Sequence, residues 1–231
     1  MKEIETITTT KLIRAAGIAA LVAGALFLLP QFIHPEDQIA QVTTSSWAVA
    51  HLVNTTMAVL ALIGVTGLYL RQVREMGALG LIGFVLLGTG FLMIAIVSFV
   101  EAVILPQIVD TAPGYVSDFL ATLVGDPVRG DVGGLTLANQ VAAAAYLLGG
   151  LVFGIGLYRA RILARWAAVL LSLGALASLL AAVLPDSILR TATFPSAIAL
   201  MGLGYSLWRD ARVGSSQPVP SPHGSLRTSG V

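Results

Sequence analysis

Hydrophobic residues occur along the chain in six long runs, which charged residues and prolines separate. The runs cover residues 15–33, 51–70, 76–105, 135–158, 166–185 and 191–208. Each is close to or above the roughly 20 residues that a helix needs to cross about 30 Å of hydrocarbon. Because hydrocarbon holds no water to bond the backbone, such runs form helices. The pattern therefore predicts an all-α, polytopic bundle of six transmembrane helices.

The first run also has basic residues before an apolar core, as a signal peptide has. Its apolar stretch is long, however, no clear cleavage site with small residues follows it, and five more runs come after it. We therefore interpret this run as a helix that the protein retains.

Composition supports a membrane location. Hydrophobic residues make up 56% of the chain and charged residues 11%, whereas soluble domains carry about 25% charged residues. The net charge of +1 gives no sign of a nucleic-acid partner. The chain has no cysteine, which excludes disulfides, thiol catalysis, iron–sulfur clusters and cysteine-bound zinc. The expected surroundings are the lipid bilayer of a bacterial cytoplasmic membrane.

Lysine and arginine are unevenly distributed between the two sides that six crossings define. If the N-terminus is cytoplasmic, the outer side holds only Arg129 and Arg190. The inner side then holds Lys2, Lys11, Arg14, Arg71, Arg74, Arg159, Arg161, Arg165, Arg209, Arg212 and Arg227. The positive-inside rule accordingly predicts that both termini lie in the cytoplasm.

The runs also repeat in pairs. The first, third and fifth begin with RAAGIAAL, REMGALGLIG and RWAAVLLSLG and end with ALFLLP, AVILP and AAVLP. The second, fourth and sixth end with GLYLR, GLYRA and GYSLWR. This predicts three helical hairpins that enter the membrane in the same direction, as a parallel repeat. Glycines in the runs indicate close helix packing, notably Gly83, Gly88, Gly90, Gly149, Gly150, Gly154, Gly156, Gly202 and Gly204.

The longest connection, residues 106–134, contains a helical pattern. Its apolar stripe consists of Tyr115, Val116, Phe119, Leu120, Leu123 and Val124, with Asp118 and Thr122 on the other side. We expect a short helix lying flat on the outer surface, either as a packed loop or as a lid. After Arg212, serine, proline and glycine dominate. This predicts a transmembrane domain over 1–212 and a disordered cytoplasmic tail over 213–231, which includes His223.

Polar residues gather near the outer ends of the predicted helices. Glu101 interrupts an apolar run and is the sole acid to do so, which makes it a candidate for function because an ionisable group in a span is costly. The candidate ligand-binding residues at the same level are Trp47, His51, Asn54, Thr55, Ser98, Glu101, Asn139 and Gln140. Such a group can be a structural cluster, a ligand pocket or a catalytic centre, and the sequence leaves all three open.

A metal centre would need His34, His51 and Glu101 to converge. Two histidines and one carboxylate suit zinc or non-haem iron, and His51 beside Glu101 could also act as an acid or base. A haem between His34 and His51 is a further option. The chain has no HExxH motif, no HxxxH motif and no second closely spaced ligand pair. No cofactor is therefore required by the sequence.

Four motifs of the chain are similar to those of a known group of proteins. They are R-A-A-G…L-L-P-x-x-x-H-P at 14–35, W-A-V-A-H at 47–51, G-L-Y-L-R-Q at 67–72 and V-E-A-V-I-L-P at 100–106. With them the chain resembles a group of uncharacterised bacterial multi-helix membrane proteins. That group has no established activity, so the resemblance implies a membrane bundle and no catalytic residues. The signature of mitochondrial carriers is missing after Pro30, Pro106 and Pro185.

We expect binding rather than catalysis. A small molecule, a lipid headgroup or a partner membrane protein would dock in a shallow outward-facing pocket at His51, Asn54, Glu101 and Gln140. A homo-oligomer is a further option. One alternative is a metal-assisted hydrolase that uses His34, His51 and Glu101. The other is a small-solute transporter, which would need polar lining that continues inward.

Overall fold

The structure of the chain, a computed structural model, describes residues 7–33, 38–181 and 193–214. Within these ranges it is helical and holds no strand. The long helices are α1 (Thr9–Leu28), α3 (Ser45–Arg71), α4 (Val73–Phe99), α7 (Leu135–Ala160), α8 (Arg165–Ala181) and α10 (Phe194–Gly214). The shorter elements are α2 (Pro30–Ile33), η1 (Ile39–Gln41), η2 (Val100–Ile104), α5 (Leu105–Ile108) and α6 (Pro113–Val124).

Four helical segments in the described residues are long and apolar enough to cross a membrane. They are Thr9–Phe32, Ser45–Arg71, Val73–Ile108 and Leu135–Ala160. They correspond to the first four hydrophobic runs of the sequence and indicate an integral membrane protein. The fifth and sixth runs form α8 and α10. Residues 182–192, where those two runs were expected to end and begin, lie outside the described residues, as do His34 and residues 215–231 of the predicted tail.

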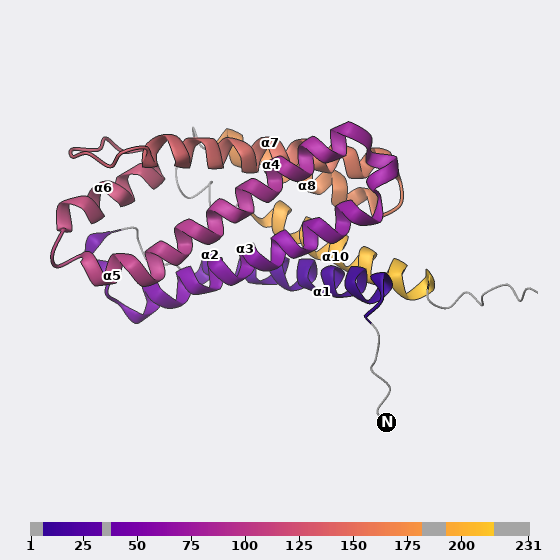
Figure 1. Cartoon of the computed structure of the whole chain (residues 1–231), viewed down its shortest axis with the longest axis horizontal. Coiled ribbons are helices and arrows are strands. Elements are labelled where there is room, and N and C mark those ends of the chain that lie inside the picture. Colours follow the sequence, from indigo (N-terminus) through magenta and orange to yellow (C-terminus); the bar gives the residue numbers. More distant parts are fainter. Residues whose placement is uncertain (1–6, 34–37, 182–192, 215–231) are drawn as a thin grey trace, which may run out of the picture.

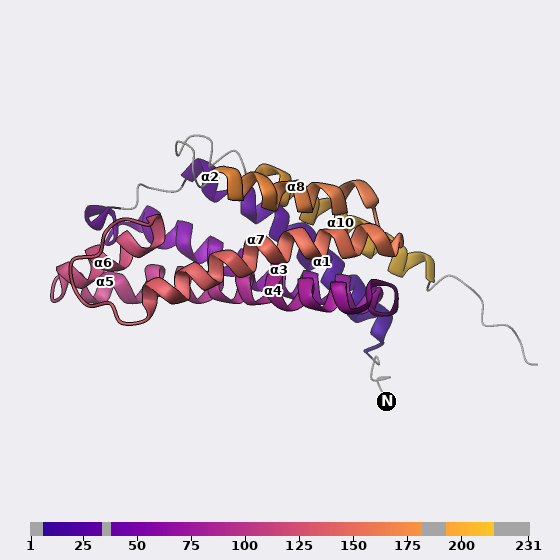
Figure 2. The same ribbon diagram turned by 90° about the horizontal axis from the view of Figure 1, so that it is seen from above.

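The long helices pack in a ring that follows chain order. Successive contacts join α1 to α3, α3 to α4, α4 to α7, α7 to α8 and α8 to α10, and α10 packs back against α1 (Figures 1 and 2). The start of α1, the α3–α4 and α7–α8 connections and the end of α10 lie at one end, called here the basic end. The elements η1, α5 and α6 lie at the other, called the α6 end (Figure 1).

Glycines permit the closest contacts between neighbouring helices. A Cβ on Gly83 of α4 would lie 2.5 Å from the backbone nitrogen of Phe153 on α7, and one on Gly90 would lie 2.6 Å from Cα of Tyr146. Gly204 of α10 meets the backbone of Leu21 on α1 in the same way. Without a hydrophobic effect between helices in lipid, close backbone approach of this kind is a main source of association. The close packing that these glycines predicted is confirmed at these contacts.

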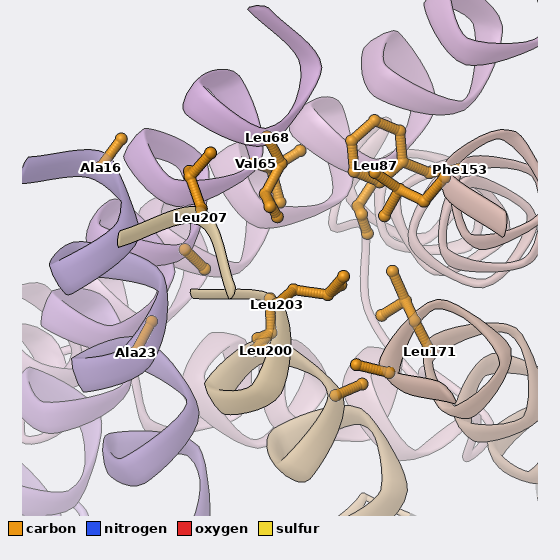
Figure 3. Close-up of a cluster of buried hydrophobic side chains, with 14 of the residues drawn as sticks. Ala16, Ala23, Val65, Leu68, Leu87, Phe153, Leu171, Leu200, Leu203 and Leu207 are labelled. Atoms are coloured by element: carbon orange, nitrogen blue, oxygen red, sulfur yellow. The ribbon is translucent and has the colours of Figure 1, made fainter. Parts of the chain in front are cut away.

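Apolar side chains fill the middle of the ring. Figure 3 shows those from α1, α3, α4, α7, α8 and α10 meeting there, among them Leu87, Phe153, Leu171, Leu200 and Leu203. Each of the five has 5% or less of its surface exposed. The centre of the described bundle is therefore a packed core, and it offers no polar lining at this level.

Two features fix the basic end. Gly77 near the start of α4 has φ 57° and ψ −154°, which a residue with a side chain rarely adopts, so the chain can turn sharply from α3 into α4. The Arg71 guanidinium on α3 donates two hydrogen bonds, of 2.6 and 3.3 Å, to the carboxylate of Asp210 on α10. This two-point contact joins helices on opposite sides of α1.

Helix α6 confirms the predicted element and the burial of Val116, Phe119 and Leu120 from its apolar stripe, but the rest of its orientation differs. It ends at Gly125, whose φ of 79° provides a left-handed C-cap. Asp118 and Thr122, expected on the outward side, are both buried, whereas Tyr115 and Val124 of the predicted apolar stripe are exposed. The reason is local: the Asp118 carboxylate accepts hydrogen bonds from the backbone N–H groups of Arg129 (3.0 Å) and Gly130 (2.8 Å) and holds the following loop.

Candidate functional site

Glu101 lies in a π-helical turn, η2, between α4 and α5. In this turn the Leu105 N–H donates to the carbonyl of Val100, five residues earlier, instead of to that of Glu101. The donor five residues after Glu101 would be Pro106, which has no N–H. The proline thus deprives the Glu101 carbonyl of a helical partner, and π turns are frequent at functional sites.

Trp47 on α3 supplies the missing donor. Its indole N–H donates a hydrogen bond of 2.8 Å to the carbonyl oxygen of Glu101. Both residues are buried, with 0% of Trp47 and 5% of Glu101 exposed. Since an unbonded buried carbonyl is costly, this contact satisfies the turn and fixes α3 against it.

His51 lies one turn after Trp47 on the same helix and faces the Glu101 side chain. Its Nδ1 atom is 2.9 Å from Oε2 of Glu101, and the two form an ion pair whenever the imidazole is protonated. The imidazole also packs on the Trp47 ring, with centroids 4.2 Å apart. Only 2% of His51 is exposed. Trp47, His51 and Glu101, called here the buried triad, therefore join α3 to η2.

The next turn of the same interface holds three further predicted residues. Asn54 on α3 donates a hydrogen bond of 3.4 Å from its side-chain amide to the hydroxyl of Ser98 on α4. The Thr55 hydroxyl donates to the backbone carbonyl of His51 at 2.9 Å. Thr55 thus bonds within its own helix, and its side chain gives no cross-helix link to the buried triad.

Helix α6 belongs to the same apolar cluster as Trp47 of the triad. Trp47 packs in a second apolar cluster with Leu105 and Val109, and with Val116, Phe119 and Leu120 of α6. The shallow, outward-facing pocket expected around His51 and Glu101 is not open at these residues, because both side chains are buried, with 2% and 5% of their surfaces exposed. The sequence predicted that these polar groups lie at the same height in the bundle, but it could not show that they would be buried.

No group of three or more histidine, cysteine or acidic residues that could hold a metal occurs among the described residues. His34, the third member of the predicted metal set, lies outside them. His51 and Glu101, whose Nδ1 and Oε2 atoms are 2.9 Å apart, thus supply two potential ligands, and the hydrolase stays a prediction.

Asn139 and Gln140, near the start of α7, belong to a second feature. The Asn139 amide donates a hydrogen bond of 2.8 Å to the hydroxyl of Thr122 on α6, and the Thr122 hydroxyl donates at 2.7 Å to the carbonyl of Phe119. Asn139 therefore ties α7 to α6. The structure gives neither amide a contact with the buried triad.

A groove of about 420 Å³ lies between α4, α6 and α7. It is lined by Met93, Ile94, Val97, Thr122, Leu123, Val124, Gly125, Asn139, Gln140, Ala142, Ala143 and Tyr146. Its polar groups, Thr122, Asn139 and Gln140, are at the α6 end, and below them the walls are apolar as far as Tyr146. The volume is within the usual range of small-molecule sites.

Sequence reasoning found the two amides of this groove and missed most of its other lining residues. Met93, Ile94, Val97, Ala143 and Tyr146 are ordinary residues of a transmembrane helix, so nothing in their type marks them as lining. Thr122 was assigned to the wrong side of its helix. One feature of the sequence did point to this region. The long connection at 106–134 predicted a helix that packs on the outer surface of the bundle.

Comparison with models of protein families, with curated proteins and with solved structures gives no significant match for this chain.

Proposed function

We propose that this chain is an integral protein of the cytoplasmic membrane that binds a small amphiphilic molecule, a membrane lipid, in the groove between α4, α6 and α7. It would cross the membrane six times, with α8 and α10 completing three hairpins, and both termini would be cytoplasmic. The α6 end would then face outward.

The groove is the observation that carries this proposal. It combines two amides and a hydroxyl at one end with apolar walls further in, which is the arrangement that an amphiphile requires. Its walls come from α4 and α7, which are both long and apolar enough to span the membrane. A lipid can therefore reach it without leaving hydrocarbon.

The buried triad supports the groove in this proposal and takes no part in chemistry. Trp47 anchors the apolar cluster on which α6 packs, and α6 supplies Thr122, Leu123, Val124 and Gly125 to the groove. The position of α6, which forms one wall of the groove, thus depends on the π turn, Trp47 and His51. Catalysis would require an opening to His51 or Glu101, and both are closed off by their neighbours.

The proposed orientation rests on charge. The described inner-side residues Lys11, Arg14, Arg71, Arg74, Arg159, Arg161, Arg165, Arg209 and Arg212 belong to the helix ends and connections of the basic end, whereas Arg129 follows α6. A cytoplasmic basic end agrees with the positive-inside rule.

The groove is tested by filling it. Ala143 lines it, whereas the next residue of α7, Ala144, is exposed and does not. We expect Ala143→Phe to lower the amount of lipid retained after detergent washing about tenfold, measured by native mass spectrometry. The matched variant Ala144→Phe adds the same ring outside the groove and should retain lipid as the unmodified protein does. Equal retention in both variants would contradict the proposal.

A further inference from the structure

We infer that the groove holds one straight hydrocarbon chain of a membrane phospholipid and that Tyr146 limits the length of chain that enters. This rests on the proposed function and adds its ligand class and a residue that determines specificity. The limit follows from three observations: the direction of the groove, the chemistry of its two ends and the fixed position of Tyr146.

The groove runs along α7 from Asn139 to Tyr146. These positions are seven residues apart in one helix, which corresponds to about 10 Å at 1.5 Å per residue. On the facing helix the lining runs the same way, from Val97 near the α6 end to Met93 further in. The groove therefore extends along the helix axis, which is the direction in which an extended chain would lie.

The chemistry of the two ends indicates which way the ligand lies. No charged residue is among the described residues that line the groove, so the ligand is not held by a salt bridge. Gln140 and Asn139 offer amide groups at the α6 end, where they can bond an ester or a phosphate oxygen. Further in, alanine, isoleucine and methionine side chains offer only apolar contact, which suits the hydrocarbon chain.

Tyr146 is the lining residue of α7 that lies furthest from the α6 end, and it is held from two sides. Its ring packs edge to face on the buried ring of Phe91, with centroids 5.5 Å apart and an interplanar angle of 80°. Its backbone is against Gly90, where even a Cβ would come within 2.6 Å. A ring fixed in this way acts as a rigid floor.

With Tyr146 at its inner end, the length of the groove sets how many carbons of a hydrocarbon chain it can hold. An extended chain with carbon–carbon bonds of about 1.5 Å advances by about 1.25 Å per carbon. About 10 Å of groove therefore accommodates about eight carbons. Carbons beyond these remain outside the groove and gain no further contact with its walls.

The test uses lysophosphatidylcholines with chains of 6 to about 16 carbons, added to full-length protein in a steroid-based detergent that has no alkyl chain of its own. The readout is the rise in the midpoint of thermal unfolding. For the unmodified protein we expect the rise to increase up to about eight carbons and then to level off. In Tyr146→Ala, the chain length at which the rise in the unfolding midpoint levels off should be longer by about three carbons. Tyr146→Phe keeps the ring and should leave that chain length unchanged.

Met93→Trp tests the same limit from the opposite wall, independently of whether Tyr146→Ala folds. The larger side chain should move the levelling point to shorter chains. A rise that grows steadily with chain length in the unmodified protein, or a levelling point that neither variant moves, would overturn the length limit and leave binding in the groove intact. If no lysophosphatidylcholine has any effect and Ala143→Phe retains lipid normally, the proposed function itself fails.

Discussion

At the scale of single residues, the Glu101 carbonyl shows how one proline shapes the buried triad. Pro106 removes a backbone donor, the helix adopts a π turn, and the indole of Trp47 replaces that donor from the neighbouring helix. The same turn brings the Glu101 carboxylate against His51. The side chains of Trp47 and Pro106 therefore depend on each other although they are distant in sequence.

Trp47→Phe should destabilise the protein by about 1–2 kcal/mol, because the buried Glu101 carbonyl loses its donor and the smaller ring leaves space. The measurement is chemical or thermal unfolding in detergent. Trp166→Phe is the control, since 59% of Trp166 is exposed and it has no such role. Equal stability of the two variants would show that the hydrogen bond contributes nothing.

A double-mutant cycle separates the hydrogen bond from the loss of ring volume. Pro106→Ala restores a backbone N–H that can reach the Glu101 carbonyl. We therefore expect Trp47→Phe to cost less in the Pro106→Ala background than in the unmodified protein. Purely additive effects would mean that the two residues are not coupled.

At the scale of helices, the position of each glycine decides how closely two helices pack. Gly83 meets the backbone of α7, which cannot move aside, whereas a Cβ on Gly88 would lie 3.4 Å from a side-chain methyl of Leu62 and meet nothing closer. Both glycines are on α4 and belong to the same apolar run. Their sequence surroundings are alike, and only the packing distinguishes them.

Gly83→Ala should consequently destabilise the bundle by about 1–3 kcal/mol, because the added methyl group forces α4 and α7 apart. Gly88→Ala should be neutral or slightly stabilising, since alanine favours helix. Thermal unfolding of the two variants side by side is the measurement. A similar loss in both would mean that helix–helix contact is not what Gly83 provides.

At the scale of the whole molecule, the closed ring of helices places the ends of all hairpins at two opposite faces. The α3–α4 and α7–α8 connections lie with both described chain ends at the basic end, and α6 covers the other (Figure 1). Such a ring is what three parallel hairpins would produce, which supports the proposed repeat. Which of the two ends faces the cytoplasm then decides on which side of the membrane the groove lies.

Because the chain has no cysteine, single introduced cysteines report orientation directly. Asp126 follows α6 and Glu75 lies in the first turn of α4, and both are exposed. We expect a membrane-impermeant maleimide to label Asp126→Cys in intact cells and Glu75→Cys only after lysis. The reverse pattern would place the basic end outside and contradict the proposed topology.

The sequence by itself determined the helical class and the helix-forming runs, because hydrophobic length and backbone hydrogen bonding leave no other structure in lipid. It also predicted that His51, Asn54, Ser98 and Glu101 lie at a similar height across the membrane. The height of a residue in a helix follows from the number of residues that precede it in that helix. Helix ends differed by a few residues: the run predicted at 51–70 forms Ser45–Arg71.

Only the tertiary structure decided which of those polar residues meet and which stay apart. His51 and Glu101 are buried with their Nδ1 and Oε2 atoms 2.9 Å apart, whereas Asn139 and Gln140 border a separate groove. Which of these residues meet depends on how each helix is rotated about its axis. It also depends on the π turn at Glu101 and on the hydrogen bonds from the loop after α6 to Asp118. Each depends on contacts between residues that are remote in the chain, and a pattern of hydrophobic and polar positions does not specify such contacts.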